Sequence, residues 1–78
     1  MTDTHKPGAQ IHYQIKVQGK LDHRWSDWFS GLTIAVVDEH QNPPITTLTG
    51  SIDQPTLRGI LNQIWDLNLT LISVIPIE

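Results

Sequence analysis

Apolar and polar residues alternate along the first ordered part of the chain. In residues 11–18 the apolar positions are Ile11, Tyr13, Ile15 and Val17, and the positions between them are polar. A period of two is typical of a strand with one buried and one solvated face. The alternation therefore predicts a strand that lies on the edge of a hydrophobic core.

Three further segments have the composition of strands. Residues 32–37 are rich in β-branched side chains, residues 45–52 are rich in threonine, and residues 69–75 are almost entirely apolar. The polar loop 38–44 joins the first two of these segments and predicts a hairpin with a long connection. The threonines of 45–52 predict a solvated or edge face for that strand. In the last strand, Pro76 limits how far the strand can extend as a central strand of the sheet.

A helix is predicted over residues 53–67. Asp53 is expected to cap it and Pro55 is tolerated in its first turn, while Asn68 suits a left-handed exit. Gly59 inside this helix indicates a close approach to a neighbouring backbone. The apolar stripe consists of Leu57, Ile60, Leu61, Ile64 and Leu67.

A short helical turn over residues 22–30 carries most of the aromatic side chains. Asp22 is a plausible N-cap and Gly31 suits the left-handed residue that ends a helix. Trp25, Trp28 and Phe29 follow at the spacing of one helical face. In so small a core this spacing favours inward packing, so we interpret the turn as a structural clamp; exposed rings would instead mark the place to look for function.

Together these elements predict a two-layer α+β domain. Its sheet has four mainly antiparallel strands, and the helix 53–67 and the short turn 22–30 complete it. The first three strands form either an antiparallel meander or, with the turn as a reduced crossover helix, a ferredoxin-like fold. The segment 22–30 is short for a crossover, so the meander is favoured.

Length and composition restrict the remaining possibilities. The chain has 78 residues, which gives one domain over 10–78 after a polar, flexible arm over 1–9. With no cysteine there is no disulfide to support a small core, so association with a second copy is the expected way to bury more apolar surface. No stretch has the length of a membrane span or the form of a signal peptide, and we expect a soluble cytoplasmic protein.

The charges exclude several classes of partner. The formal net charge is −3, and the five lysines and arginines are scattered, so neither nucleic acid nor an anionic membrane is an expected partner. The five glycines are isolated and form no phosphate-binding loop, and the histidines lack the spacing of metal ligands. No cofactor and no metal is therefore expected.

The polar residues of the turn do not form a catalytic constellation. Ser26, His23 and Asp27 are too close on one turn to act as nucleophile, base and orienting group. His23 and Asp27 could share one face, but two residues do not complete a metal site. No catalytic residue is assigned, and this pair is kept as a weak candidate.

Aromatic residues supply the other candidates. Trp25 and Trp28, with Tyr13, could wall a small-ligand pocket. Trp65 lies beside the apolar stripe of the helix, either draped over its edge or anchoring a contact between subunits.

Two blocks of the chain resemble a group of short uncharacterised bacterial proteins. The first block, within 19–34, contains the string Trp25-Ser26-Asp27-Trp28-Phe29, and the second extends over 53–74. The resemblance covers most of residues 11–75. It implies a bacterial source and carries no function.

Three functions follow from these observations. The favoured one is a non-enzymatic protein-interaction or regulatory module that acts as a homo-oligomer, with an unidentified protein partner also allowed. The alternative is a small-ligand-binding domain with an aromatic pocket. An enzyme with its site at a subunit interface is the weakest, because 78 residues hardly enclose a water-excluding site within one subunit.

Overall fold

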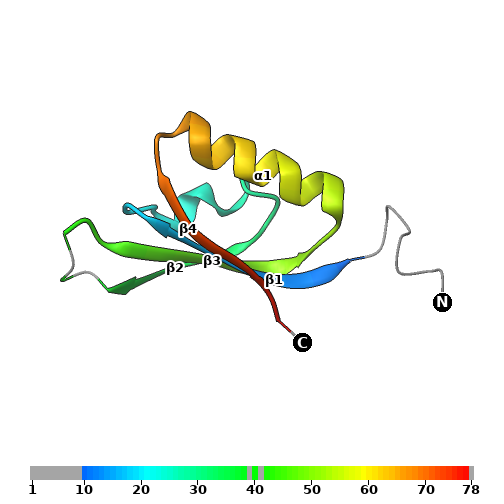
Figure 1. The fold of residues 1–78 in the computed structure, drawn as a ribbon, viewed down its shortest axis with the longest axis horizontal. Helices are drawn as coiled ribbons and strands as arrows, with labels where there is room; N and C mark the ends of the chain where they lie inside the picture. The colour runs from blue at the N-terminus through cyan, green and yellow to red at the C-terminus, as the bar shows by residue number, and fades with distance from the viewer. Residues whose placement is uncertain (1–9, 39, 41, 78) are drawn as a thin grey trace.

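Six elements follow one another along the chain. The computed structural model describes residues 10–38, 40 and 42–77, apart from the side chains of His23 and Asp38; the proposed arm, residues 1–9, lies outside this range. A four-stranded antiparallel sheet, one main helix and one short helical turn confirm the α+β class (Figure 1). The elements are β1 (Ile11–Gln18), the 3-10 helix η2 (His23–Ser26), β2 (Thr33–Asp38), β3 (Ile45–Ile52), α1 (Gln54–Asp66) and β4 (Thr70–Pro76).

The strands are ordered β2-β3-β1-β4 across the sheet. β1 pairs antiparallel with both β3 and β4, and β2 pairs antiparallel with β3. β1 is therefore parallel to β2 with β3 between them, and β3 is parallel to β4 with β1 between them. The favoured meander is wrong, because β1 does not neighbour β2. The order and directions are those of the split β-α-β arrangement in the ferredoxin-like alternative.

The first crossover is longer than the turn that suggested it. It runs over residues 19–32, from the end of β1 to the start of β2, and η2 occupies only a small part of it. A crossover between parallel strands needs about a dozen residues. The non-helical residues on both sides of η2 supply the missing length, which explains why the turn by itself looked too short.

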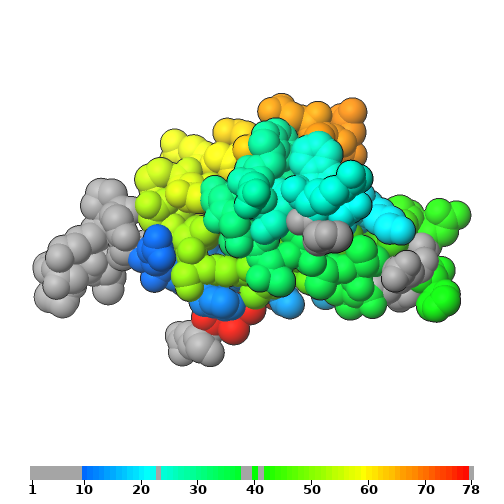
Figure 2. All heavy atoms as spheres, turned by 180° about the vertical axis from the view of Figure 1, so that it is seen from behind, coloured from blue at the N-terminus to red at the C-terminus, as the bar shows by residue number. Residues whose placement is uncertain are grey.

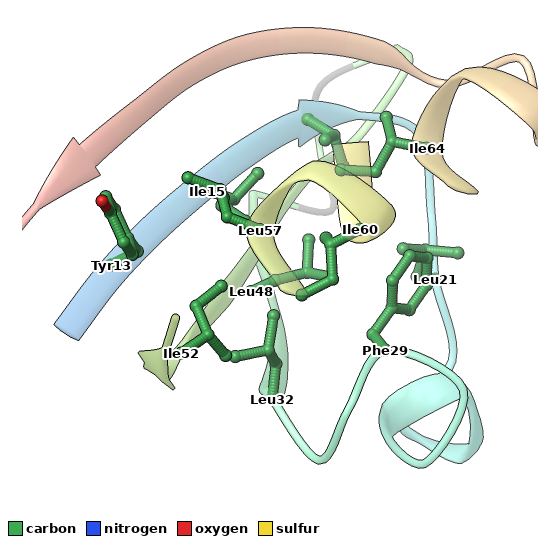
Figure 3. Packing of buried hydrophobic residues seen from close by; sticks show 11 residues of the cluster. Tyr13, Ile15, Leu21, Phe29, Leu32, Leu48, Ile52, Leu57, Ile60 and Ile64 are labelled. Carbon is green, nitrogen blue, oxygen red and sulfur yellow. The ribbon is translucent and has the colours of Figure 1, made fainter. Parts of the chain in front are cut away.

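Both crossovers lie on the same side of the sheet (Figure 1). α1 packs against β4, and η2 packs against β2, so that the two share one face. Ile15 and Leu48 are direct partners in the central β1–β3 pair, and both are fully buried. Figure 3 shows the apolar side chains of α1 and of the first crossover directed onto these strands; those fully or almost fully buried are Leu57, Ile60, Ile64, Leu21, Phe29 and Leu32.

Two threonines of β3 are buried, contrary to the solvated or edge face that this segment predicted. β3 is a central strand. The Thr46 hydroxyl donates a 2.6 Å hydrogen bond to the carbonyl of Gly19, and the Thr47 hydroxyl donates one of 3.4 Å to the carbonyl of Ala35. A buried hydroxyl costs little when its hydrogen bond is made, which lets threonine take core positions.

The ends of α1 are formed as the sequence predicts. The Asp53 carboxylate accepts a 2.9 Å hydrogen bond from the backbone N–H of Thr56, and a proline follows within the first turn. Asn68 has a φ of 60° and provides the left-handed exit. The prediction for Gly59 is wrong: it is exposed, and a Cβ built on it meets no atom within 4 Å.

We predict that Gly59→Ala stabilises the protein. Alanine fits the open space at this helical position and restricts the unfolded chain, which should raise the free energy of unfolding by about 0.5–1 kcal/mol. Gly31→Ala is the matched control: Gly31 has a φ of 78°, so alanine there should cost about 1–2 kcal/mol. Urea denaturation of both variants measures the two effects, and equal shifts would contradict the prediction.

The Asp53 cap predicts a dependence of stability on pH. Hydrogen bonds from the hydroxyl and then the backbone N–H of Thr56 hold the pKa of the Asp53 carboxyl below its ordinary value of 3.8. The pKa of Asp53 is lower in the folded chain than in the unfolded chain. The carboxylate therefore stabilises the fold fully above the unfolded-state pKa, and this stabilisation is lost as the pH falls through the folded-state pKa. Asp53→Asn keeps an acceptor but does not titrate.

The difference in unfolding free energy between the wild type and Asp53→Asn should therefore shrink as the pH falls below the ordinary pKa of 3.8. Urea denaturation at a series of pH values measures it. A difference that stays constant over this range would show that the charge of Asp53 contributes nothing to the cap.

Candidate functional site

The Trp-rich turn is closed by hydrogen bonds within its own segment. The Asp22 carboxylate accepts from the backbone N–H of Arg24 at 3.1 Å, which confirms Asp22 as the N-cap of η2. The Ser26 hydroxyl donates to the carbonyl of Leu32 at 2.6 Å, and the Ser26 carbonyl accepts from the N–H of Gly31 at 2.8 Å. The segment is thus a compact loop whose return is tied to its start, and Gly31 has the left-handed conformation expected of it.

The three aromatic rings of this loop do not share one environment. Phe29 is fully buried, whereas Trp25 and Trp28 are 37% and 44% exposed. The prediction that both indoles pack inward is wrong. η2 ends at Ser26, so Trp28 and Phe29 lie in the turn that follows the helix and point in different directions. We call the exposed pair, Trp25 and Trp28, the aromatic ledge.

The ledge is built on the buried ring. Trp28 makes an edge-to-face contact with Phe29 at 5.1 Å between centroids and a second one with Trp25 at 5.2 Å. The Gln63 side chain of α1 also donates to the carbonyl of Trp28 at 3.3 Å. Figure 2 shows the cyan-to-green first crossover on the surface, between α1 above and the sheet below. The ledge is therefore a supported, outward-facing aromatic surface.

The polar residues of the loop are arranged at its surface. Arg24 forms an ion pair with Asp22 at 3.2 Å, in which both side chains are exposed. Asp27 is exposed, and its carbonyl accepts from the N–H of Ser30. The side chain of His23 lies outside the described part of the structure, so the His23–Asp27 pair remains a prediction.

Tyr13 is not part of the ledge. It is buried, and its hydroxyl accepts a 2.6 Å hydrogen bond from Gln54 in the first turn of α1. Gln63, which contacts Trp28, lies nine positions further along the helix. At 1.5 Å per residue this is about 13 Å along the helix axis. The structure therefore does not bring Tyr13 together with Trp25 and Trp28 as walls of one pocket.

Trp65 lies on the opposite flank of α1. It lies two positions after Gln63, which corresponds to about 200° around the helix axis. Since Gln63 faces the first crossover, Trp65 faces away from it, toward the side where α1 packs against β4. Its side chain is 56% exposed. This exposure fits both interpretations of Trp65, the ring draped over the helix edge and the anchor of a contact between subunits, and the subunit contact stays a prediction.

β4 forms a second apolar surface that the site prediction missed. It is an edge strand of the sheet. Ile72 and Ile75 are 44% and 47% exposed, although they belong to the most apolar segment of the chain. We call Trp65, Ile72 and Ile75 the edge patch. The signal was present in the sequence: residues 67–77 contain no ionisable side chain.

The edge patch extends across both layers of the protein. Ile75 pairs with Gln14 of β1, and Gln14 alternates with the buried residues Tyr13 and Ile15. Ile75 therefore belongs to the sheet face opposite the helix. Ile72 is the extra residue of the bulge between the Lys16–Ser73 and Val17–Leu71 pairs. With Trp65 on the helix, the patch runs from the helix layer over the strand to the open sheet face.

Other site types have no geometric support in the described residues. Within them no three His, Cys, Asp or Glu side chains are close enough to hold a metal ion. No helix in the described part of the chain is long and apolar enough to cross a membrane.

Comparison with known proteins gives a family and no activity. A family model described as Domain of unknown function (DUF8691) matches residues 12–75. No curated protein and no solved structure matches the chain at a significant level. The match confirms an uncharacterised family; the bacterial source and the Trp-Ser-Asp-Trp-Phe string as its hallmark stay predictions. Since the match covers most of the chain, the protein belongs to the family Domain of unknown function (DUF8691).

Proposed function

We propose that this chain is a non-enzymatic interaction module that associates with itself. The observation that carries the proposal is the edge patch, which combines an exposed tryptophan of α1 with two exposed isoleucines of the edge strand β4. Exposed apolar surface around an edge strand is costly in water and is a common feature of interfaces. Trp65 is also the residue type most often found among the energetic centres of interfaces.

The size of the chain supports the same proposal. One helix and one short crossover cover one face of the sheet, so the hydrophobic core is small (Figure 3). Domains of this length gain stability from disulfides, metals or a partner, and this chain has no cysteine. A second copy would be such a partner and would add buried apolar area. A cytoplasmic location belongs to the proposal as well, and the cysteine-free composition fits it.

We predict a concentration-dependent dimer. Sedimentation equilibrium should show a mass of twice the 8.8 kDa of one chain at micromolar concentration. Trp65→Ala should weaken the association by about 30-fold or more if this ring is an interface centre. Trp28→Ala is the matched control, because it removes an indole of comparable exposure on the other side of the molecule. A monomer at these concentrations, with Trp65→Ala unchanged, would contradict the proposal.

A second candidate function is favoured by the exposure of the aromatic ledge. Exposed indoles held by a buried ring offer flat apolar faces on which a ligand can stack. The scarcity of cations makes a nucleotide or another polyanion a poor ligand, so a neutral ligand with a flat apolar face, such as a sugar ring, is the best fit.

Tryptophan fluorescence tests this candidate in the Trp65→Phe background, which removes the third indole. Titration with a panel of mono- and disaccharides should then give a saturable shift in emission, and the further change Trp28→Ala should abolish it. Emission that no sugar in the panel alters would remove this function, and a shift that persists without Trp28 would place binding elsewhere.

A further inference from the structure

The two edges of the sheet are chemically different. β4 carries no charge, and the chain remains uncharged over residues 67–77. β2, at the other edge, ends at an acidic residue, Asp38. Charged side chains on an edge strand hinder its pairing with another strand, and an edge without them is open to such pairing. β4 is thus the edge that this protein leaves available to a further strand.

We propose that a second copy of this chain pairs its β4 antiparallel with this β4, about a two-fold axis, joining the two sheets into one. The proposal rests on the self-association argued above and specifies its geometry. In such a pair, backbone N–H and C=O groups of the two strands satisfy one another. The same patch serves on both copies, as a two-fold contact requires.

Electrostatics favour a second copy at this edge. Each chain carries a formal charge of −3, so two copies have the same sign of net charge. The segment 67–77 brings no charge to the contact, and antiparallel pairing of two such segments buries no ionised group. The edge is therefore a place where two like-charged copies can approach without a desolvation penalty for charge.

The edge patch includes residues of both the helix layer and the sheet, which argues against a single foreign strand as the occupant. An added peptide would pair with β4 and could cover Ile72 and Ile75, but it has no helix layer to reach Trp65. A second copy extends both layers at once: β4 continues the sheet, and α1 continues the helix layer next to Trp65. Since Trp65 is 56% exposed, an added strand alone would leave this large apolar side chain in water.

The bulge in β4 is compatible with this pairing. Beyond the bulge, Ser73, Val74, Ile75 and Pro76 pair regularly with β1, so this part of the strand keeps an even outer edge. Pro76 at its end lacks a donor, which limits how far pairing can extend. The contact is therefore expected to centre near Ser73, the middle residue of Thr70–Pro76.

Single cysteines test this geometry directly, because the chain contains no native cysteine. Residues that face each other near the axis of an antiparallel pair have Cα atoms at about 4.5–5.5 Å, within the range of a disulfide. Ser73→Cys, at the expected centre of the contact, should form disulfide-linked dimers under mild oxidation. The matched controls are Val37→Cys, on the β2 edge, and Thr49→Cys, on the open sheet face, which should remain monomeric on a non-reducing gel.

A charge placed on the edge gives an independent readout. Ile72→Lys should weaken dimerisation at least tenfold in sedimentation equilibrium, whereas Val37→Lys should leave it unchanged. Val37 is 59% exposed and lies at the bulge of the other edge strand, so the two variants make the same chemical change at comparable positions. Circular dichroism establishes that both variants keep the fold before their masses are compared.

The outcomes separate this inference from the proposed function. A wild-type monomer would overturn both. A dimer that Val37→Cys or Thr49→Cys cross-links, and that tolerates Ile72→Lys, would retain self-association but overturn the β4 pairing. A dimer cross-linked at Ser73 and disrupted by Ile72→Lys supports the proposed geometry.

Discussion

The antiparallel pairing of β1 with β3 is the interaction on which the rest of the structure depends. It joins residues 11–18 to residues 45–52 along their full lengths and places Ile15 directly against Leu48 at the centre of the core. Once these strands are central, β2 and β4 must be the two edges. The chain then has to cross the sheet twice, and both crossovers cover the face that carries Ile15 and Leu48 (Figure 3).

This arrangement separates the two exposed apolar surfaces. The aromatic ledge belongs to the first crossover, which packs beside β2, while the edge patch surrounds β4 at the other end of the sheet. Figures 1 and 2 show β4 in front and the first crossover behind. Since the two surfaces share no residue, a ligand at the ledge and a second copy at β4 could be bound at the same time.

The first crossover illustrates how a small domain uses its aromatic residues. Phe29 fills the core in place of a crossover helix, and its ring supports Trp28, which in turn contacts Trp25. The interpretation as a clamp is thus correct for Phe29 and wrong for the two indoles. Helical spacing from Trp25 to Phe29 suggested a common face, but the backbone leaves the helix after Ser26, and the side chains beyond that point no longer follow the helical period.

Local chemistry in the sequence determined the boundaries of α1, the caps at Asp22 and Asp53, the left-handed residues Gly31 and Asn68, and the strand 45–52. These features depend on backbone and side-chain preferences of a few neighbouring residues. The tertiary structure decided which strands pair, which tryptophans are exposed, and that Thr46 is a core residue and Gly59 has open space around it. Each of these depends on a contact between segments far apart in the chain, about which spacing along the sequence carries no information.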